Sequence, residues 1–354
     1  MKSANQDKPK MTRREFAKTL AGAGVLLTVG STIGPAIRTA SAATKQSVEN
    51  IPVILECAIT GATTKAKNPL VPETPSEQAA EIIRCLDGGA TILHTHSNQP
   101  NEDPKKAAQP YIEAYKPVWK KHPHAILYAT ANFDPKVYNQ TRKPWPGKVQ
   151  CGHQRLLAEA GLVNMVLFDT GVVPLGVYDK QGVPGPDSAF FWYGFWPEDV
   201  RFILQTCKDL GAGASISVFE PGWMKNVVAM VKAGTLPRGS KLNIYFASDN
   251  FAGMAPPIPE ALDLYLKMIE GMDLKWSVGY IGDKSVMDTP LARLALERGG
   301  SFRVGLEDWP NGTSNVDQLK RAKEIIDAVG RPVVTGADAI KYLDIPFAAT
   351  RPKA

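Results

Sequence analysis

Short apolar runs alternate with amphipathic stretches along most of this chain. The apolar runs are rich in β-branched and aromatic residues, which is typical of strands. The stretches between them repeat their apolar positions every three to four residues, as helices with one buried face do. The predicted strands are residues 52–60, 90–96, 125–130, 164–169, 215–219, 242–247, 275–280 and 302–306, and the predicted helices are 76–86, 110–120, 153–160, 197–210, 224–233, 260–272, 290–297, 316–329 and 337–343.

Helix boundary signals agree with this alternation. Thr74 and Pro75 stand where a helix begins, and Gly88 and Gly211 stand where helices end. Eight strands, each followed by a helix, predict a (β/α)8 TIM barrel. A doubly wound sheet shares the alternation but normally has fewer strands and a glycine-rich first turn. No G-x-G-x-x-G motif follows the first predicted strand.

Two predicted connections are longer than a barrel requires. One spans residues 132–152, and the other spans 170–196 and contains the aromatic sequence FFWYGFW at 190–196. Both follow the carboxyl ends of strands, where barrels carry their chemistry. The aromatic cluster could cover a pocket as a lid, or it could pack on the barrel rim or at a dimer contact, and the sequence leaves these alternatives open.

Candidate chemistry begins with His94 and His96, which close the second predicted strand. Side chains two apart on a strand point the same way, roughly 6–7 Å apart at about 3.3 Å per residue. Only five histidines occur in the chain. Two imidazoles on one face suit a metal ion, although an H-x-H pair at a strand end also occurs without one.

The barrel prediction supplies a third ligand. The ends of alternate strands converge, so we expect acids there to approach the histidines: Asp169 ends the fourth strand, Asp249 follows the sixth, and Glu307 ends the eighth. Two imidazoles and the Glu307 carboxylate would leave an open position on tetrahedral Zn²⁺, the default metal for such ligands. An acid after the last strand is also a common helix cap. Arg303 shares the Glu307 face, and Asp308 is a candidate partner for its charge.

The first 42 residues predict a signal peptide. The sequence TRREFAK at 12–18 resembles the twin-arginine export motif, a mildly apolar stretch follows, and Ala40-Ser41-Ala42 fits a cleavage site. The apolar stretch is too interrupted by glycine and proline for a stable membrane span. We therefore expect a signal at 1–42, a single catalytic domain at 43–354, export by the twin-arginine machinery, and a periplasmic location.

Charge argues against nucleic acid as a partner. Residues 1–42 hold seven basic and two acidic side chains, so without them the formal charge falls from +6 to +1. No basic stripe interleaved with aromatic residues remains. The four cysteines form no C-x-x-C pair. Cys57, Cys85 and Cys207 read as buried apolar residues, while Cys151 falls in a predicted loop; we expect no disulfide framework.

These motifs together resemble the β-keto acid cleavage enzymes, typified by 3-keto-5-aminohexanoate cleavage enzyme. The similarity spans the chain after residue 42, through ITGA at 59–62, ILHTH at 92–96, FEPG at 219–222, RVGLED at 303–308 and GRP at 330–332. An amidohydrolase is a second class of metal barrel with an H-x-H pair, but it would need further histidines and a lysine on the middle strands. His122, His124 and His153 do not lie at strand ends.

The resemblance implies a mechanism and an assembly. His94, His96 and Glu307 would hold Zn²⁺, which would polarise the keto group of a small keto acid substrate. Arg303 and Asp308 would be the catalytic pair that assists exchange with acetyl-CoA, giving acetoacetate and an acyl-CoA. A homo-oligomer is also implied.

The predicted substrate lining departs from the family. Thr63 stands where an acid is common, Thr130 follows an alanine that replaces a serine, Ser217 stands where an acid is usual, and Asp169 often corresponds to asparagine. We expect Thr63, Thr130, Asp169 and Ser217 to contact substrate. Because coenzyme A is cytoplasmic, export suggests a CoA-independent lyase or hydrolase of a keto or hydroxy acid, or a non-catalytic binder of a metal-chelating acid.

Overall fold

The computed structural model describes residues 48–134, 145–184 and 191–346. The predicted signal at 1–42 lies outside these ranges, as do Phe190 and parts of both long connections. Within them, no helix combines the length and apolar character needed to cross a membrane.

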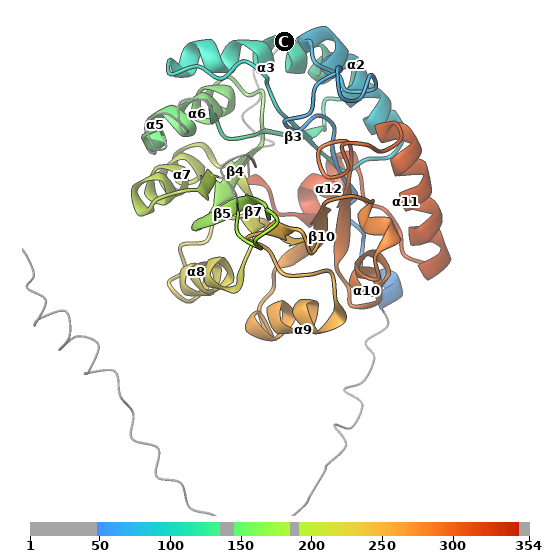
Figure 1. The fold of residues 1–354 in the computed structure, drawn as a ribbon. Coiled ribbons are helices and arrows are strands. Elements are labelled where there is room, and N and C mark those ends of the chain that lie inside the picture. Colours follow the sequence, from blue (N-terminus) through green and yellow to red (C-terminus); the bar gives the residue numbers. More distant parts are fainter. Residues whose placement is uncertain (1–47, 135–144, 185–190, 347–354) are drawn as a thin grey trace, which may run out of the picture. The chain divides into compact units, whose positions relative to one another are not determined.

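Eight parallel strands form the sheet at the centre of the molecule, in the order β3-β2-β1-β11-β10-β8-β7-β4 (Figure 1). Their bounds are β1 (Glu56–Ala58), β2 (Ile92–Thr95), β3 (Ile126–Ala129), β4 (Met165–Asp169), β7 (Gly213–Val218), β8 (Lys241–Ala247), β10 (Lys275–Ile281) and β11 (Ser301–Val304). Sequential strands are neighbours, and β1 pairs with β11, so the sheet curls into a barrel. The predicted (β/α)8 fold is confirmed.

Helices surround the strands on the outside, except that α12 lies behind the strands near the middle of the view, as Figure 1 shows. They are α2 (Pro75–Asp87), α3 (Pro104–Lys121), α5 (Gly147–Gln150), α6 (Gly152–Glu159), α7 (Pro197–Leu210), α8 (Pro221–Lys232), α9 (Pro259–Met268), α10 (Leu291–Glu297), α11 (Asn315–Val329) and α12 (Gly336–Tyr342), with 3₁₀ turns η1 (Val48–Asn50) and η2 (Val286–Asp288). The Thr74 hydroxyl accepts from Glu77 N, and the Glu77 carboxylate accepts from Thr74 N, which confirms the predicted start of α2.

The seam between β3 and β4 is joined through a side chain. Leu127 N donates to Asn164 Oδ1 at 3.1 Å, and Asn164 Nδ2 donates to the Ala125 carbonyl at 2.9 Å. The amide of Asn164 thus pairs with strand β3 much as a backbone peptide would. This bridge satisfies buried backbone groups where the ladder of the barrel is interrupted.

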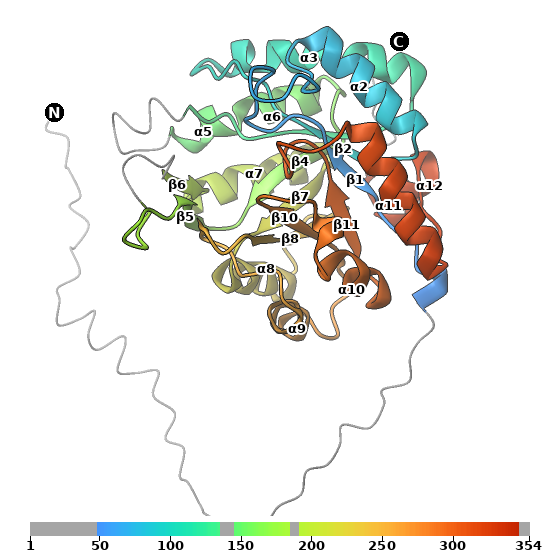
Figure 2. The same cartoon turned by 45° about the vertical axis from the view of Figure 1, so that its right-hand side comes forward.

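A second sheet of three strands, in the order β6-β5-β9, was not predicted. It comprises β5 (Val172–Val177), β6 (Phe191–Gly194) and β9 (Phe251–Ala252), all antiparallel to their neighbours. Figure 2 shows β5 and β6 beside the ends of β4 and β7. The aromatic sequence is therefore partly a strand, in which Trp192 is exposed and Tyr193 packs 5.6 Å from the ring of Phe219.

All four cysteines are buried, including Cys151, which is the single residue that connects α5 to α6. Burial in the core matches their expected role as small apolar residues.

Candidate metal centre

His94 reaches the barrel interior from the end of β2. Its strand partner is Ala58 on β1, and its side chain is 2 % exposed. The ring stacks on Tyr128 from β3, with the centroids 4.3 Å apart and the planes inclined by 25°. The neighbouring strand therefore fixes the plane of the His94 ring.

His96 lies one residue beyond the end of β2 and is held through its backbone. Its N–H donates to Thr60 Oγ1 at 2.7 Å, and its carbonyl accepts from Gln78 Nε2 at 2.7 Å. The next residue, Ser97, donates its N–H to the Tyr111 hydroxyl at 2.7 Å. These bonds fix the direction of the His96 side chain although the strand has ended.

Glu307 reaches the histidines because two glycines permit a close turn. Strand β11 ends at Val304, and Gly305 follows with φ +131°, where a Cβ would lie 2.1 Å from the Ala58 carbonyl oxygen. Glu307 N then donates to that carbonyl at 3.1 Å. Gly61, with φ +63°, would place a Cβ 2.8 Å from Glu307 Cα. Side chains at either glycine would displace the acid.

Three potential ligand atoms converge where His94, His96 and Glu307 meet, and we call these three residues the metal corner. Glu307 Oε2 lies 3.2 Å from Nε2 of each histidine, and the two Nε2 atoms lie 3.1 Å apart. A tetrahedral Zn²⁺ with bonds of about 2.0–2.1 Å separates its ligands by roughly 3.3 Å. Among the described residues, these three form the one group of histidine, cysteine or acidic side chains whose ligand atoms all lie within 4.8 Å of one another. The three side chains fit a metal ion.

Electrostatics favour the ligand forms of these groups. Burial lowers the pKa of His94 to about 3, so this imidazole is neutral near pH 7. Burial alone would raise the pKa of Glu307, but Arg303 and the two histidines hold it well below its usual range. Lone pairs of a carboxylate and a neutral imidazole repel at 3.2 Å unless a cation or a proton lies between them. This convergence therefore provides a place for positive charge.

Arg303 is bound on every side by the protein. Its Nε donates to Asp308 Oδ2 at 2.8 Å, and its Nη2 donates to Asp308 Oδ1 at 2.6 Å and to Glu307 Oε1 at 2.7 Å. Its Nη1 makes longer contacts, 3.4 Å to Glu56 Oε1 and 3.3 Å to the Tyr128 hydroxyl. All five N–H groups of the guanidinium thus face a protein oxygen. The predicted pair with Asp308 exists, and it is bidentate.

Beneath Arg303 lies a set of polar side chains that sequence reasoning missed. Glu56 is 0 % exposed and accepts from Lys241 Nζ, which also donates to Asn243 Oδ1 at 2.6 Å. Asn243 in turn donates to Ser215 Oγ at 3.0 Å, and Ser277 Oγ donates to Asn243 Oδ1. We call Glu56, Lys241, Asn243, Ser215 and Ser277 the buried charge cluster. Its signal in the sequence was a Glu and a Lys within predicted barrel strands or at their edge.

The predicted substrate residues Asp169 and Ser217 lie side by side. They are paired in register on β4 and β7, and both are buried. Burial raises the pKa of Asp169 to about 6, while hydrogen bonding from Ser217 and Tyr193 acts in the opposite direction. Burial and the neighbouring Asp169 raise the pKa of Tyr193 well above its usual range, and the charge of Glu307 adds to that rise.

The other two predicted substrate residues occupy the loops after β1 and β3. Thr63 is buried two residues beyond Gly61, the glycine that contacts Glu307. Thr130 is half-buried, donates its N–H to the Thr95 carbonyl at 3.1 Å, and accepts at its carbonyl from His153 at 2.8 Å. His153 therefore supports the end of β3. Asp308 is buried behind Arg303, and burial raises its pKa above the usual range while Arg303 opposes that shift.

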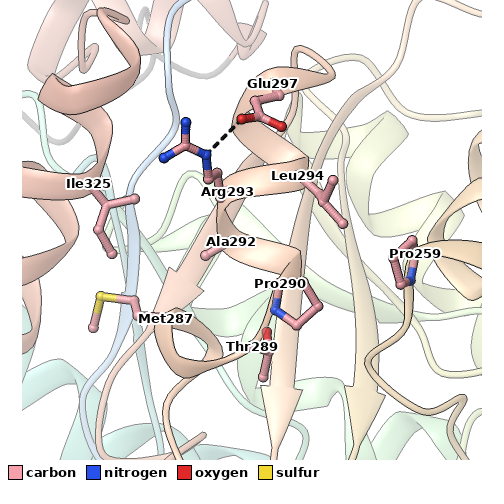
Figure 3. Close-up of a pocket in the computed structure, with 9 residues that line it drawn as sticks. All are labelled: Pro259, Met287, Thr289, Pro290, Ala292, Arg293, Leu294, Glu297 and Ile325. Atoms are coloured by element: carbon pink, nitrogen blue, oxygen red, sulfur yellow. Dashed lines mark hydrogen bonds and ion pairs between the residues drawn. The ribbon is translucent and has the colours of Figure 1, made fainter.

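A hollow on the outer surface is separate from this chemistry. It encloses about 530 Å³ between α9, η2, α10 and α11, and Figure 3 shows the Arg293–Glu297 ion pair at its edge. The Pro259, Met287 and Ile325 side chains make its wall mainly apolar. No residue of the metal corner lines it.

The chain is similar in sequence to enzymes that are named for 3-oxo or 3-keto acid substrates. The chain is 26 % identical over 306 residues to the 3-oxoadipate:acetyl-CoA acetyltransferase of Cupriavidus necator, covering 83 % of this chain and 95 % of the relative. It is 22 % identical over 307 residues to the 3-keto-5-aminohexanoate cleavage enzyme of Acetoanaerobium sticklandii, covering 83 % and 98 %. A solved ternary complex of ObcA with a C4-CoA adduct and oxalate shares the fold, with TM-score 0.56, 15 % identity, and coverage of 78 % of this chain and 67 % of that chain.

The beta-keto acid cleavage enzyme family matches residues 52–345, a range that starts just before β1 and ends just after α12. It includes both histidines of the metal corner, Glu307, and the Arg303–Asp308 pair. With this match over most of its length, the chain belongs to the β-keto acid cleavage enzyme family.

Proposed function

We propose that this protein cleaves a β-keto acid at a zinc centre held by His94, His96 and Glu307, with acetyl-CoA as acceptor. The observation that carries the proposal is the convergence of three ligand atoms at 3.1–3.2 Å beside the Arg303–Asp308 pair. Relatives named as acetyl-CoA-dependent transferases of 3-oxoadipate and 3,5-dioxohexanoate support the acceptor.

In the proposed reaction the bond between the keto carbon and the adjacent CH₂ of the substrate breaks. The CH₂COO⁻ fragment joins the acetyl group to give acetoacetate, and the remaining acyl group passes to the CoA sulfur. A bound Zn²⁺ would supply a Lewis acid for the keto oxygen. Arg303 supplies fixed positive charge next to the ligands, and Asp308 holds its guanidinium by two bonds. Asp308, kept from water, is the candidate base for a proton of the substrate CH₂, whose carbon then attacks the acetyl carbonyl and receives a proton back when the bond to the keto carbon breaks.

A panel of β-keto acids, each assayed with and without acetyl-CoA, tests the proposal. Acetoacetate and a new acyl-CoA thioester, formed only when acetyl-CoA is present, are the expected products. Ligand binding without turnover of any panel member would contradict an enzymatic role.

A second candidate follows from the twin-arginine-like sequence at residues 12–18. An exported protein would work apart from the cytoplasmic CoA pool, and we propose water as its acceptor in that case. The same panel separates the two candidates, because hydrolytic cleavage releases a free acid in the absence of CoA. Detection of the shortened chain in a periplasmic fraction would support export, and its confinement to the cytoplasm would contradict it.

A further inference from the structure

Glu56 occupies a junction between the two halves of the proposed site. Its Oε1 faces Arg303 Nη1 at 3.4 Å and accepts a hydrogen bond from the Tyr128 hydroxyl, while its Oε2 accepts from Lys241. We propose that Glu56 is a positioning residue, which sets the orientation of Arg303 and of the Tyr128 ring beneath His94. The inference deepens the proposed function and rests on it.

Acids hold the Arg303 guanidinium on both of its edges. Asp308 and Glu307 hold the Nε and Nη2 edge, and on the Nη1 side Glu56 is the acid. Tyr245 adds a ring 5.1 Å from Cζ, which attracts the cation without fixing its in-plane direction. Because Nη2 donates to Glu307 Oε1, any rotation of the guanidinium moves a donor away from a proposed metal ligand. Glu56 therefore acts on Glu307 through Arg303.

The His94 ring is supported by Tyr128, which is held in turn by Glu56. Tyr128 stacks on the His94 ring at 4.3 Å, and the Tyr128 hydroxyl ends on Glu56. A ring held at its far end is a firmer support than a ring held by packing alone. Groups that orient metal ligands from outside the first shell typically change metal affinity or activity by about 10- to 100-fold.

Lys241 supplies the charge balance that lets Glu56 do this. Its side chain is fully buried, and its ammonium is bound by Glu56 and Asn243. Without Glu56, the ammonium and the Arg303 guanidinium would be two cations without an acid between them. Removing Glu56 and Lys241 together keeps the net charge of the interior and isolates the positioning role. Because the Lys241 ammonium is ion-paired, it is a poor nucleophile for imine chemistry.

The test uses the full-length protein with Glu56→Gln/Lys241→Met. We expect about tenfold weaker Zn²⁺ binding by chelator competition. We also expect a lower kcat at nearly unchanged KM, and a displaced Arg303 Nε–H resonance in the NMR spectrum. Ser277→Ala is the matched control, since Ser277 is in the same cluster and bonds to Asn243 and the Leu242 carbonyl. It should leave zinc affinity and the Arg303 resonance unchanged.

Wild-type zinc affinity and an unchanged Arg303 resonance in the folded double variant would overturn the proposal. Equal losses in the double variant and in Ser277→Ala would also overturn it, because they would indicate general loosening of the interior. Zinc binding and the resonance are measured without substrate. Failure of the proposed function, seen as absence of cleavage by the wild-type protein, is therefore distinguishable from failure of this inference.

Discussion

The metal corner and the buried charge cluster lie on opposite sides of Arg303, and they differ in how their polar atoms are satisfied. In the metal corner, the His96 and Glu307 side chains are 22 % and 18 % exposed, and Glu307 Oε2 has no hydrogen-bond partner among the described residues. In the cluster, Glu56 and Lys241 are 0 % exposed, and their charged atoms all have protein partners. One region is arranged to receive a cation, and the other is complete in itself.

This difference has an energetic meaning. Buried polar groups that lack partners are costly, and a site that keeps them gains that free energy back when its ligand binds. A satisfied network contributes rigidity instead, provided that each member keeps its partner. TIM barrel interiors are usually filled by branched apolar residues. In this barrel the interior near β1, β8 and β11 instead holds the charged side chains of Glu56, Lys241 and Arg303.

The largest effect is expected in the metal corner. His96→Ala removes one of the three proposed ligands, so it should weaken Zn²⁺ binding by more than about 100-fold, which exceeds the effect of a group outside the ligand set, and reduce cleavage to background. Added Zn²⁺ should raise the melting temperature of the wild-type protein and leave that of the variant unchanged. A zinc-dependent rise of similar size in both proteins would show that the histidine is not a ligand.

The single change Glu56→Gln should mainly affect stability. It leaves Lys241 and Arg303 as buried cations without their shared acid, and breaking such a pair typically costs about 3–5 kcal/mol. Denaturant unfolding should show this loss, and Glu56→Gln/Lys241→Met should recover part of it. If the double variant had a lower free energy of unfolding than Glu56→Gln alone, charge balance would not be the role of Lys241.

Asp169 should give stability a specific pH dependence. Its folded-state pKa of about 6 lies above the ordinary value of 3.8, so the folded protein binds the extra proton between these pH values. Stability from this group is therefore present at low pH and falls as pH rises toward 6, by about 3 kcal/mol in total. Asp169→Asn should remove this pH dependence. The free energies of unfolding of variant and wild type, plotted against pH, should therefore change differently between pH 4 and 7. Parallel curves would contradict the assignment.

The smallest effect is expected at the outer hollow. Arg293 and Glu297 form an exposed i,i+4 pair, and such pairs contribute about 0.3–0.5 kcal/mol. Arg293→Ala should lower stability by no more than this and leave zinc binding and cleavage intact. A marked loss of activity would mean that the outer surface takes part in function.

Sequence reasoning reached the fold and the metal corner for clear physical reasons. Period-two alternation placed Arg303 and Glu307 on one face, and the two side chains do contact, although the strand ends before Glu307. Histidine is rare in this chain, so two histidines on one predicted strand indicated a site, although the observed strand β2 ends at Thr95. Asp249, which follows β8, is exposed and does not join the metal corner.

The buried charge cluster escaped because its partners come from strands far apart in the sequence. Glu56 and Lys241 are 185 positions apart, and neither residue forms a motif with its neighbours. The β6-β5-β9 sheet escaped for a similar reason. Its strand β9 pairs with β5 across more than 70 residues. The aromatic sequence at 190–196 contains β6, and nothing in that sequence indicated a three-stranded sheet.

Metal analysis of the purified protein tests the central claim most directly. We expect one Zn²⁺ per chain in the wild-type protein and none retained by His96→Ala after dialysis against a weak chelator. A wild-type protein that folds, remains monodisperse and yet takes up no stoichiometric divalent metal would contradict the assignment of His94, His96 and Glu307 as a metal centre.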